Sequence, residues 1–159
     1  MPPSLLTLVV LTALPQPASQ HIPDLSGRWV IVPEASIWHD DRDNPVNIRI
    51  FGDGFVVRQD ERTVRIAIAE DRGFEWRYNL DGTESQHVLP LPKGDGQTTS
   101  KLSFDGRRIG ITIASFYNGA QRATVRTIEL IGDDAMRVEA PFGRNGEMIG
   151  SVYRRVREH

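Results

Sequence analysis

Residues 64–68 read Val-Arg-Ile-Ala-Ile, with a large apolar side chain at every second position. A period of two points successive side chains to opposite faces of a β-strand, whereas an amphipathic helix needs spacings of three and four. The stretch therefore predicts a strand of an antiparallel sheet that buries one face.

The same alternation recurs along the chain after His21. It is found at residues 46–50, 109–113 and 136–140. Turn-forming residues separate these runs, and Asp-Gly or Asn-Gly pairs suit tight hairpins because they tolerate positive φ angles. The turn signals lie at 52–54, 70–73, 81–82, 94–96, 105–106, 118–119, 132–134 and 145–146. We expect about ten strands, one of them short or merged, near 27–33, 46–51, 54–59, 62–69, 74–79, 84–89, 98–104, 108–116, 123–131, 135–141 and 148–156.

These strands predict an all-β fold, a single antiparallel meander β-barrel of about 8–10 strands. Closing such a sheet on itself removes both of its exposed edges. A β-sandwich is the alternative. Helical periodicity is not evident over ten or more residues, and the best candidate for a short helix is 33–43, either a lid or an ordinary connection.

Composition limits the classes of function. The chain has 159 residues, a formal net charge of −2 and no cysteine. This length predicts one domain, and the charge excludes a dominant basic surface for nonspecific binding of nucleic acid. Disulfides, thiolate catalysis and thiolate-bound zinc are excluded too.

The first twenty residues contain no Asp, Glu, Lys or Arg, whereas the chain beyond His21 is densely charged. The apolar run at 5–14 has the size of a signal-peptide core and is about half the length that a membrane-spanning helix needs. We therefore expect a signal peptide at 1–20, a barrel domain at 21–159, no transmembrane segment, and a secreted or periplasmic location. A disordered or anchoring tail is the alternative.

Residues 24–29 read Asp-Leu-Ser-Gly-Arg-Trp, and the apolar run 30–32 follows them. This opening, with its Gly27-x-Trp29, resembles the first strand of the calycin barrels, the lipocalins and their relatives. The resemblance implies that an arginine of the last strand covers the tryptophan at the closed end. Because Val152 and Val156 share a face with Arg154, Arg154 is the predicted partner of Trp29.

The opening is also similar to that of small secreted bacterial proteins with lipocalin-like domains of unassigned function. The shared positions are Gly27, Trp29, Pro33, Glu34 and Ser36, together with the hairpin at 78–84. The further motifs of true lipocalins are not evident, so the resemblance does not by itself imply a large open ligand cup.

The sequence indicates no cofactor, no metal site and no catalytic residue. The histidines at 21, 39, 87 and 159 are not spaced to share a face, and residues 39–44 lack the glycine and distal glutamate of a calcium loop. Hydrolase and phosphate-loop motifs are missing. Catalysis is therefore less favoured than binding.

A barrel of this size is either filled by side chains or wide enough for one small ligand. We therefore expect a binding module, monomeric or weakly dimeric, for a small, largely apolar molecule or a secreted protein partner. The expected interior wall is Phe55, Val57, Ile66, Ile68, Trp76, Ile111, Ile113, Phe116 and Val138. The alternatives are an inhibitor of a secreted enzyme, which would need an exposed ordered segment at 21–25, and an enzyme with its site at the barrel mouth.

Overall fold

A computed structural model describes residues 22–68, 74–91, 94–117, 120–142 and 145–157. The expected signal peptide at 1–20 and the expected turns at 70–73 and 118–119 lie outside the described residues.

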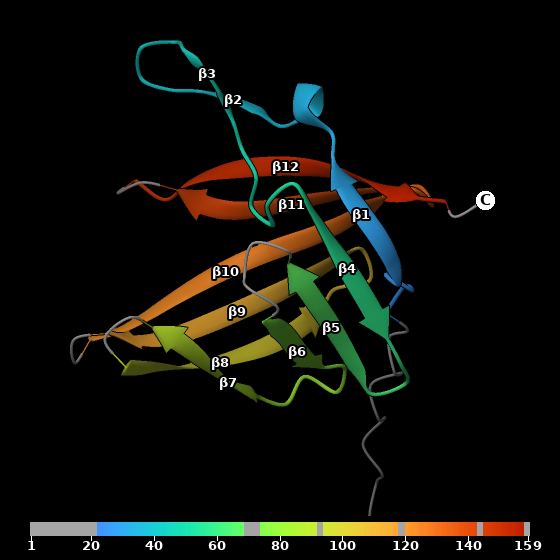
Figure 1. The fold of residues 1–159 in the computed structure, drawn as a ribbon, viewed down its shortest axis with the longest axis vertical. Coiled ribbons are helices and arrows are strands. Elements are labelled where there is room, and N and C mark those ends of the chain that lie inside the picture. Colours follow the sequence, from blue (N-terminus) through green and yellow to red (C-terminus); the bar gives the residue numbers. More distant parts are fainter. Residues whose placement is uncertain (1–21, 69–73, 92–93, 118–119, 143–144, 158–159) are drawn as a thin grey trace, which may run out of the picture.

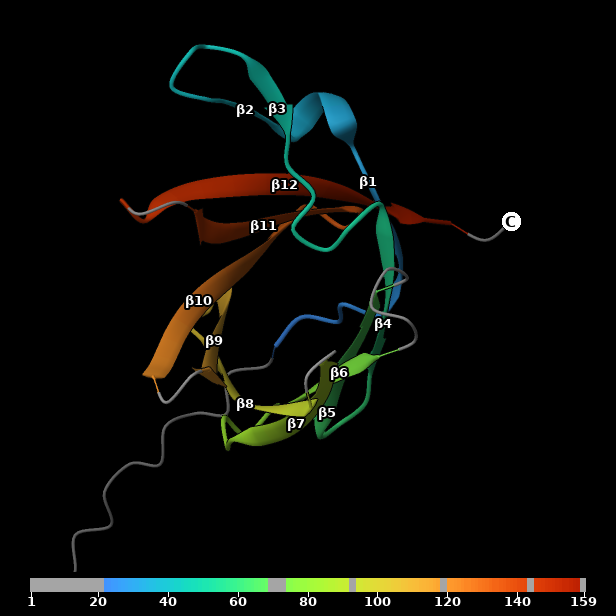
Figure 2. The same cartoon turned by 60° about the vertical axis from the view of Figure 1, so that its left-hand side comes forward.

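Within these residues, ten strands form one antiparallel sheet that curls into a nearly closed barrel (Figure 1 and Figure 2). The strands are β1 (Gly27–Ile31), β4 (Gly54–Gln59), β5 (Thr63–Ile68), β6 (Glu75–Asn79), β7 (Ser85–Leu91), β8 (Gly94–Phe104), β9 (Arg108–Tyr117), β10 (Ala120–Ile131), β11 (Ala135–Phe142) and β12 (Glu147–Val156). Their order in the sheet is β6-β5-β4-β1-β12-β11-β10-β9-β8-β7. The predicted all-β barrel is confirmed, and the sandwich alternative is wrong because a single sheet surrounds the core.

The first and last strands pair with each other. Trp29 lies opposite Arg155 in the β1–β12 ladder and opposite Phe55 in the β1–β4 ladder. The barrel is less complete between β6 and β7, which pair in the described sheet only with β5 and β8 respectively. Near this seam, the backbone N–H of Asn79 donates to Ser85 Oγ at 3.2 Å.

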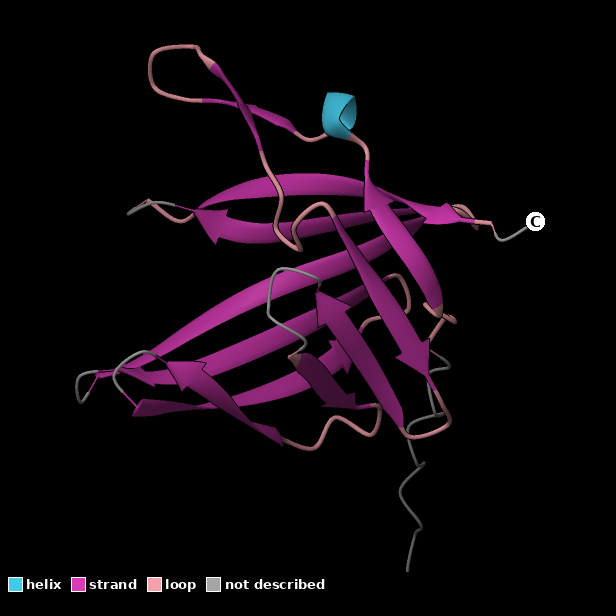
Figure 3. Ribbon diagram, viewed as in Figure 1, coloured by secondary structure: helices cyan, strands magenta, loops and turns pink. Residues whose placement is uncertain are grey.

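The first part of the connection from β1 to β4, as far as Asn47, stands above the barrel, as Figure 3 shows. It contains a 3-10 turn, η1 (Pro33–Ala35), and a two-stranded sheet of β2 (Ile37–His39) and β3 (Pro45–Asn47). The strand expected at 46–51 is therefore wrong beyond Asn47, because 48–50 leave the hairpin and approach β12.

The turn expected at 94–96 is also wrong. Leu91 pairs with Gly94 and Pro90 with Asp95, so β8 already begins at Gly94. Residues with strong turn preference are drawn into a strand here because cross-strand pairing overrides local propensity.

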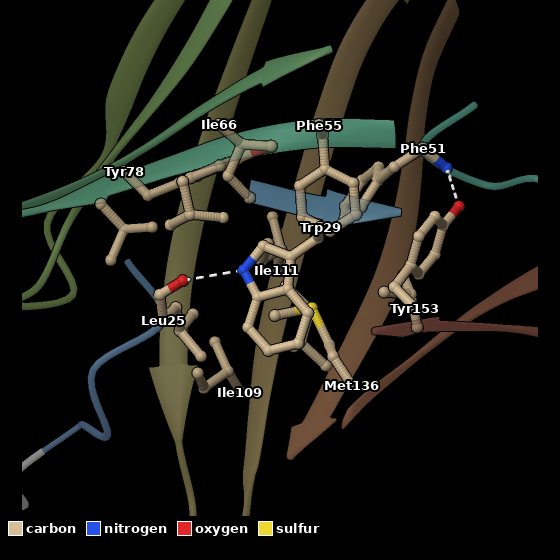
Figure 4. Close-up of a cluster of buried hydrophobic side chains, with 14 of the residues drawn as sticks. Leu25, Trp29, Phe51, Phe55, Ile66, Tyr78, Ile109, Ile111, Met136 and Tyr153 are labelled. Carbon is tan, nitrogen blue, oxygen red and sulfur yellow. Dashed lines mark hydrogen bonds between the residues drawn. The ribbon is translucent and has the colours of Figure 1, made fainter. Parts of the chain in front are cut away.

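One apolar cluster fills the barrel around Trp29 (Figure 4). Residues of widely separated strands meet in it, and Trp29, Met136, Val138 and Tyr153 are completely buried. The ring of Phe55 lies 4.9 Å from that of Tyr153 and 5.0 Å from that of Phe51, in edge-to-face contacts that favour such pairs.

Candidate functional site

The base of the barrel is closed by Trp29 and an arginine, but the arginine is Arg155. Its Cζ lies 4.8 Å from the centre of the Trp29 ring, whereas Arg154 is exposed. The prediction of Arg154 was wrong because the buried face of β12 carries Ser151 and Tyr153, and Arg155 lies on that same face. The neighbouring valines, which suggested the other face, are only partly buried.

The segment before β1 completes this base. Trp29 Nε1 donates to the carbonyl oxygen of Leu25 at 3.0 Å, and Arg155 Nη2 donates to that of Asp24 at 3.0 Å. Leu25 is 1% exposed and Ile22 is 9% exposed. Residues 22–25 therefore pack against the barrel instead of projecting from it.

Most of the expected interior wall belongs to the packed core. Five of the nine residues are at most 3% exposed: Phe55, Val57, Ile66, Ile111 and Val138. Ile68 and Ile113 are slightly more exposed, and Trp76 is partly buried against the cluster. The Phe116 side chain lies outside the described part of the chain. The structure thus brings these residues together, and their contact with a ligand stays a prediction.

Inward-facing side chains change from apolar to polar along β8 and β9. Successive cross-strand pairs are Leu102 with Ile111, Ser100 with Ile113, and Thr98 with Ser115. The interior therefore has an apolar end near Trp29 and a second end, which we call the polar end, where His87, Thr98, Ser100 and Ser115 face inward.

His87 is the central group of the polar end. It is 6% exposed, and its Nε2 lies 2.7 Å from Ser100 Oγ. Thr98 Oγ1 and Ser115 Oγ are 3.4 Å apart. Burial lowers the pKa of His87 below its ordinary value of 6.5, because desolvation disfavours the charged imidazolium. The ring is therefore neutral at pH 7.

Aromatic rings surround His87 on the side of the β6–β7 seam. The ring centre of Trp76 lies 5.0 Å away, that of Tyr78 5.9 Å and that of Phe74 6.2 Å. Sequence reasoning missed His87, because a lone histidine carries no motif. What marks His87 is that it faces the barrel interior together with other polar side chains, and only the strand register shows this.

Arg126 of β10 lies at the level of the apolar core, whereas Arg122 lies opposite Ser115 at the polar end. Arg126 pairs with Ile111 across β9 and β10 and shares an inward parity with buried Ile128. Its Cζ lies 5.5 Å from the centre of the Phe51 ring, which is 1% exposed. Arg126 is partly buried, and no carboxylate among the described residues lies within ion-pair distance of it.

Phe51 reaches Arg126 because residues 48–52 pack onto the inner face of β12. Ser151 Oγ donates to the Ile48 carbonyl at 2.9 Å, and Phe51 N–H donates to the Tyr153 hydroxyl at 2.8 Å. The part of the β1–β4 connection that packs against the interior is thus 48–52 and not 33–43, the segment for which a lid and an ordinary connection were the two interpretations.

The acidic loop at 39–44 uses its carboxylate internally. Asp40 Oδ1 accepts hydrogen bonds from the backbone N–H groups of Arg42 and Asn44, both at 2.9 Å. These bonds lower the pKa of Asp40. Across the described ranges, no cluster of His, Asp or Glu side chains is arranged to hold a metal ion.

Two grooves are lined by described residues of the barrel wall. The larger of these two, about 630 Å³, is lined by Asp53 and by residues of β1, β4 and β5, among them Arg28. The smaller, about 490 Å³, lies near the β10–β11 turn. Neither contains the polar end.

No protein-family model, curated protein or solved structure matches the chain. Among the described residues, no helix is both long enough and apolar enough to cross a bilayer.

Proposed function

We propose that this chain is a secreted or periplasmic, lipocalin-like binding protein that holds one small, largely apolar molecule at the polar end of its barrel. The supporting observation is the polarity change along the inner face of β8 and β9, from Leu102 opposite Ile111 to Thr98 opposite Ser115. Interior packing alone favours apolar side chains at every inward position, because buried polar groups cost free energy unless they find partners.

The proposed site has an apolar floor and a polar rim. Ile68 and Ile113 border the core at 7% and 8% exposure, and Trp76 is partly buried against the same cluster. Above this floor, His87 and the hydroxyls of the polar end supply a few fixed hydrogen-bonding groups. Ligand sites in proteins combine these two elements, since apolar contact gives affinity and polar groups give orientation.

An inhibitor function is less well supported. It would use an N-terminal segment that reaches into an enzyme, but Ile22 and Leu25 are buried at the barrel base. A general protein-interaction role has no comparable local observation in its favour. For catalysis, His87 is the one inward-facing histidine of the described strands, and its bonded neighbour is a serine hydroxyl rather than a carboxylate that would orient it as a base.

The proposal can be tested with N-phenyl-1-naphthylamine, a neutral apolar probe that fluoresces on leaving water. We expect saturable, one-to-one binding to the mature protein. Ser115→Trp should weaken this binding about tenfold or more, because the indole fills the polar end. Thr112→Trp is the matched control, since Thr112 is an exposed residue of the same strand.

Two results would count against the proposal: no saturable binding by folded wild-type protein, or equal loss of binding in both variants. Native mass spectrometry of protein purified from its own host gives an independent check. A small molecule that co-purifies with wild type and not with Ser115→Trp supports the assignment.

A further inference from the structure

We infer that Arg126 binds an anionic oxygen-bearing group on the ligand, so that the barrel takes an apolar molecule with a carboxylate, sulfonate or phosphate substituent. This inference rests on the proposed binding function and adds the chemical class of the ligand. Its basis is a partly buried arginine at inward parity, two inward positions along β10 from the residue opposite Ser115, with no carboxylate partner among the described residues.

The strand register places Arg126 at the boundary between the two ends of the interior. Its cross-strand neighbour Ile111 belongs to the apolar core, and two residues along β10 Thr124 lies opposite Ile113. Arg126 is therefore level with Leu102 and Ile111, the last wholly apolar pair, one inward position from Ile113. A ligand that reaches past Ile113 would bring its substituent to this level.

Carboxylates of the described strands are engaged elsewhere. Glu139 of β11, the strand beside β10, lies at outward parity and accepts a hydrogen bond from Thr127 Oγ1 at 3.4 Å. Glu129 is bound by Arg107 and Arg108 on the opposite face of β10, and Glu75 is bound by Arg58. Glu147 accepts a hydrogen bond from Trp38 Nε1 at 3.2 Å. The positive charge of Arg126 therefore faces the interior, and no carboxylate of the described strands pairs with it.

The contact of Arg126 with Phe51 orients the guanidinium without neutralising it. A cation above an aromatic face keeps its edge N–H groups available, and these can donate two parallel hydrogen bonds to one oxyanion. An arginine suits this task because its planar group stays charged at any physiological pH. Removing part of its hydration by burial strengthens its attraction for an anion.

His87 fits the same ligand as a neutral hydrogen-bonding group. Because burial keeps its ring uncharged at pH 7, Arg126 and not His87 supplies the attraction for an anion. Arg122, which shares the inward parity of Arg126, is exposed and can contribute only a long-range, salt-screened field.

The test uses two probes that differ by one group. 1-Anilinonaphthalene-8-sulfonate is N-phenyl-1-naphthylamine with an added sulfonate, so the ratio of their affinities isolates the contribution of the anion. We expect wild type to prefer the sulfonate. Arg126→Gln should weaken sulfonate binding about tenfold or more while changing binding of the neutral probe less than about twofold.

Arg137→Gln is the control, because Arg137 is an exposed arginine of β11 at outward parity and should leave both affinities unchanged. Arg126→Lys should recover part of the preference, since it keeps the charge but not the two-pronged geometry. Thermal unfolding of each variant establishes that the sulfonate probe reports on folded protein.

The outcomes separate the two proposals. If the neutral probe binds at the Ser115 site and Arg126→Gln lowers both affinities equally, or neither, the inference about the anion is overturned and the binding function stands. If neither probe binds folded wild type, both are overturned. Inorganic sulfate is the third arm: we expect it to compete only weakly, and displacement of the sulfonate probe at equal concentration would show a bare anion site and contradict the ligand class.

Discussion

At the scale of single residues, Trp29 and Arg155 hold the first strand, the last strand and the N-terminal segment together. The indole N–H binds Leu25, the guanidinium stacks on the indole, and one Nη of Arg155 binds Asp24. The Nε of Arg155 is buried and has no hydrogen-bond partner in the described structure. The stacking contact must therefore offset the cost of that lost hydration.

Arg155→Met should lower the free energy of unfolding by about 1–2 kcal/mol, because it removes the stacking contact and the bond to Asp24. Arg154→Met, which changes an exposed neighbour, should alter it by less than about 0.5 kcal/mol. Urea unfolding followed by tryptophan fluorescence measures both. Equal effects, or a larger effect at Arg154, would contradict the assignment of Arg155 to the base.

Gly54 allows β1 and β4 to approach closely. A Cβ added there would lie 2.9 Å from the carbonyl oxygen of Trp29, a backbone atom that cannot move aside cheaply. Gly54→Ala should therefore destabilise the protein by about 1–3 kcal/mol. Gly150→Ala is the matched strand control, since its Cβ would meet only ordinary contacts from 3.7 Å outward. Comparable unfolding midpoints for the two variants would rule out this close approach.

At the scale of elements, aspartates at the starts of hairpin turns organise the meander. Asp60 Oδ1 accepts the N–H groups of Arg62 and Thr63, each at 2.8 Å. Asp105 Oδ1 does the same for Arg107 at 2.9 Å and Arg108 at 2.7 Å. The backbone hydrogen bonds lower the pKa of both carboxyls below 3.8 because they stabilise the ionised form.

The sign of the resulting pH dependence follows from the direction of these shifts. A carboxyl whose pKa is lower in the folded state stabilises the fold above 3.8, and this contribution is lost as the pH falls below that value. Between about pH 4 and pH 2, the double variant Asp60→Asn, Asp105→Asn should therefore lose less unfolding free energy than wild type does. Asp41→Asn, at an exposed aspartate, is the control. If the double variant loses unfolding free energy with falling pH as steeply as wild type, the two aspartates do not stabilise the turns in this way.

Ser36 anchors the β1–β4 connection to β12. Its hydroxyl accepts the Val152 N–H at 2.9 Å and donates to the Val32 carbonyl at 2.8 Å, and the residue is fully buried. Ser36→Ala leaves a buried N–H unsatisfied and should cost about 1–3 kcal/mol of unfolding free energy. Ser103→Ala, at an exposed serine of β8, should cost little. If Ser36→Ala is as stable as wild type in urea, the hydroxyl does not anchor the connection.

At the scale of the whole molecule, the barrel is least complete at the β6–β7 seam, and side chains fill what the ladder leaves open. Trp76 and Tyr78 of β6 contact His87 of β7 across it. A neutral imidazole packs in this aromatic surrounding at lower cost than a charged one. Closure of the barrel should thus depend on the protonation state of His87.

Because burial lowers the pKa of His87 in the folded state, the unfolded chain binds the proton more readily. Its neutral form supports the fold above pH 6.5, and stability should fall as the pH drops below that value. We expect His87→Gln to remove most of the decrease in Tm between about pH 6.5 and pH 5, and the exposed His39→Gln to leave it unchanged. A wild-type Tm that stays constant over this interval would contradict the prediction.

Sequence patterns could predict the strands because alternation and turn chemistry are local. Residues 64–68 lie in β5 and residues 109–113 lie in β9, as expected, and the Gly27-x-Trp29 opening lies at the barrel base. Most of the predicted wall residues lie in the core for the same reason. Local patterns failed at 46–51 and 94–96, where pairing with distant strands determined the conformation.

The amino-acid order by itself determined the fold class, since alternating apolar and polar residues define the buried and exposed faces of each strand. Only the tertiary structure decided that Arg155 rather than Arg154 meets Trp29, and that His87 and Arg126 face the same interior. The physical reason is that the register between strands distant in sequence sets which parity of each strand points inward. That register depends on the packing of the entire barrel, which no single strand encodes.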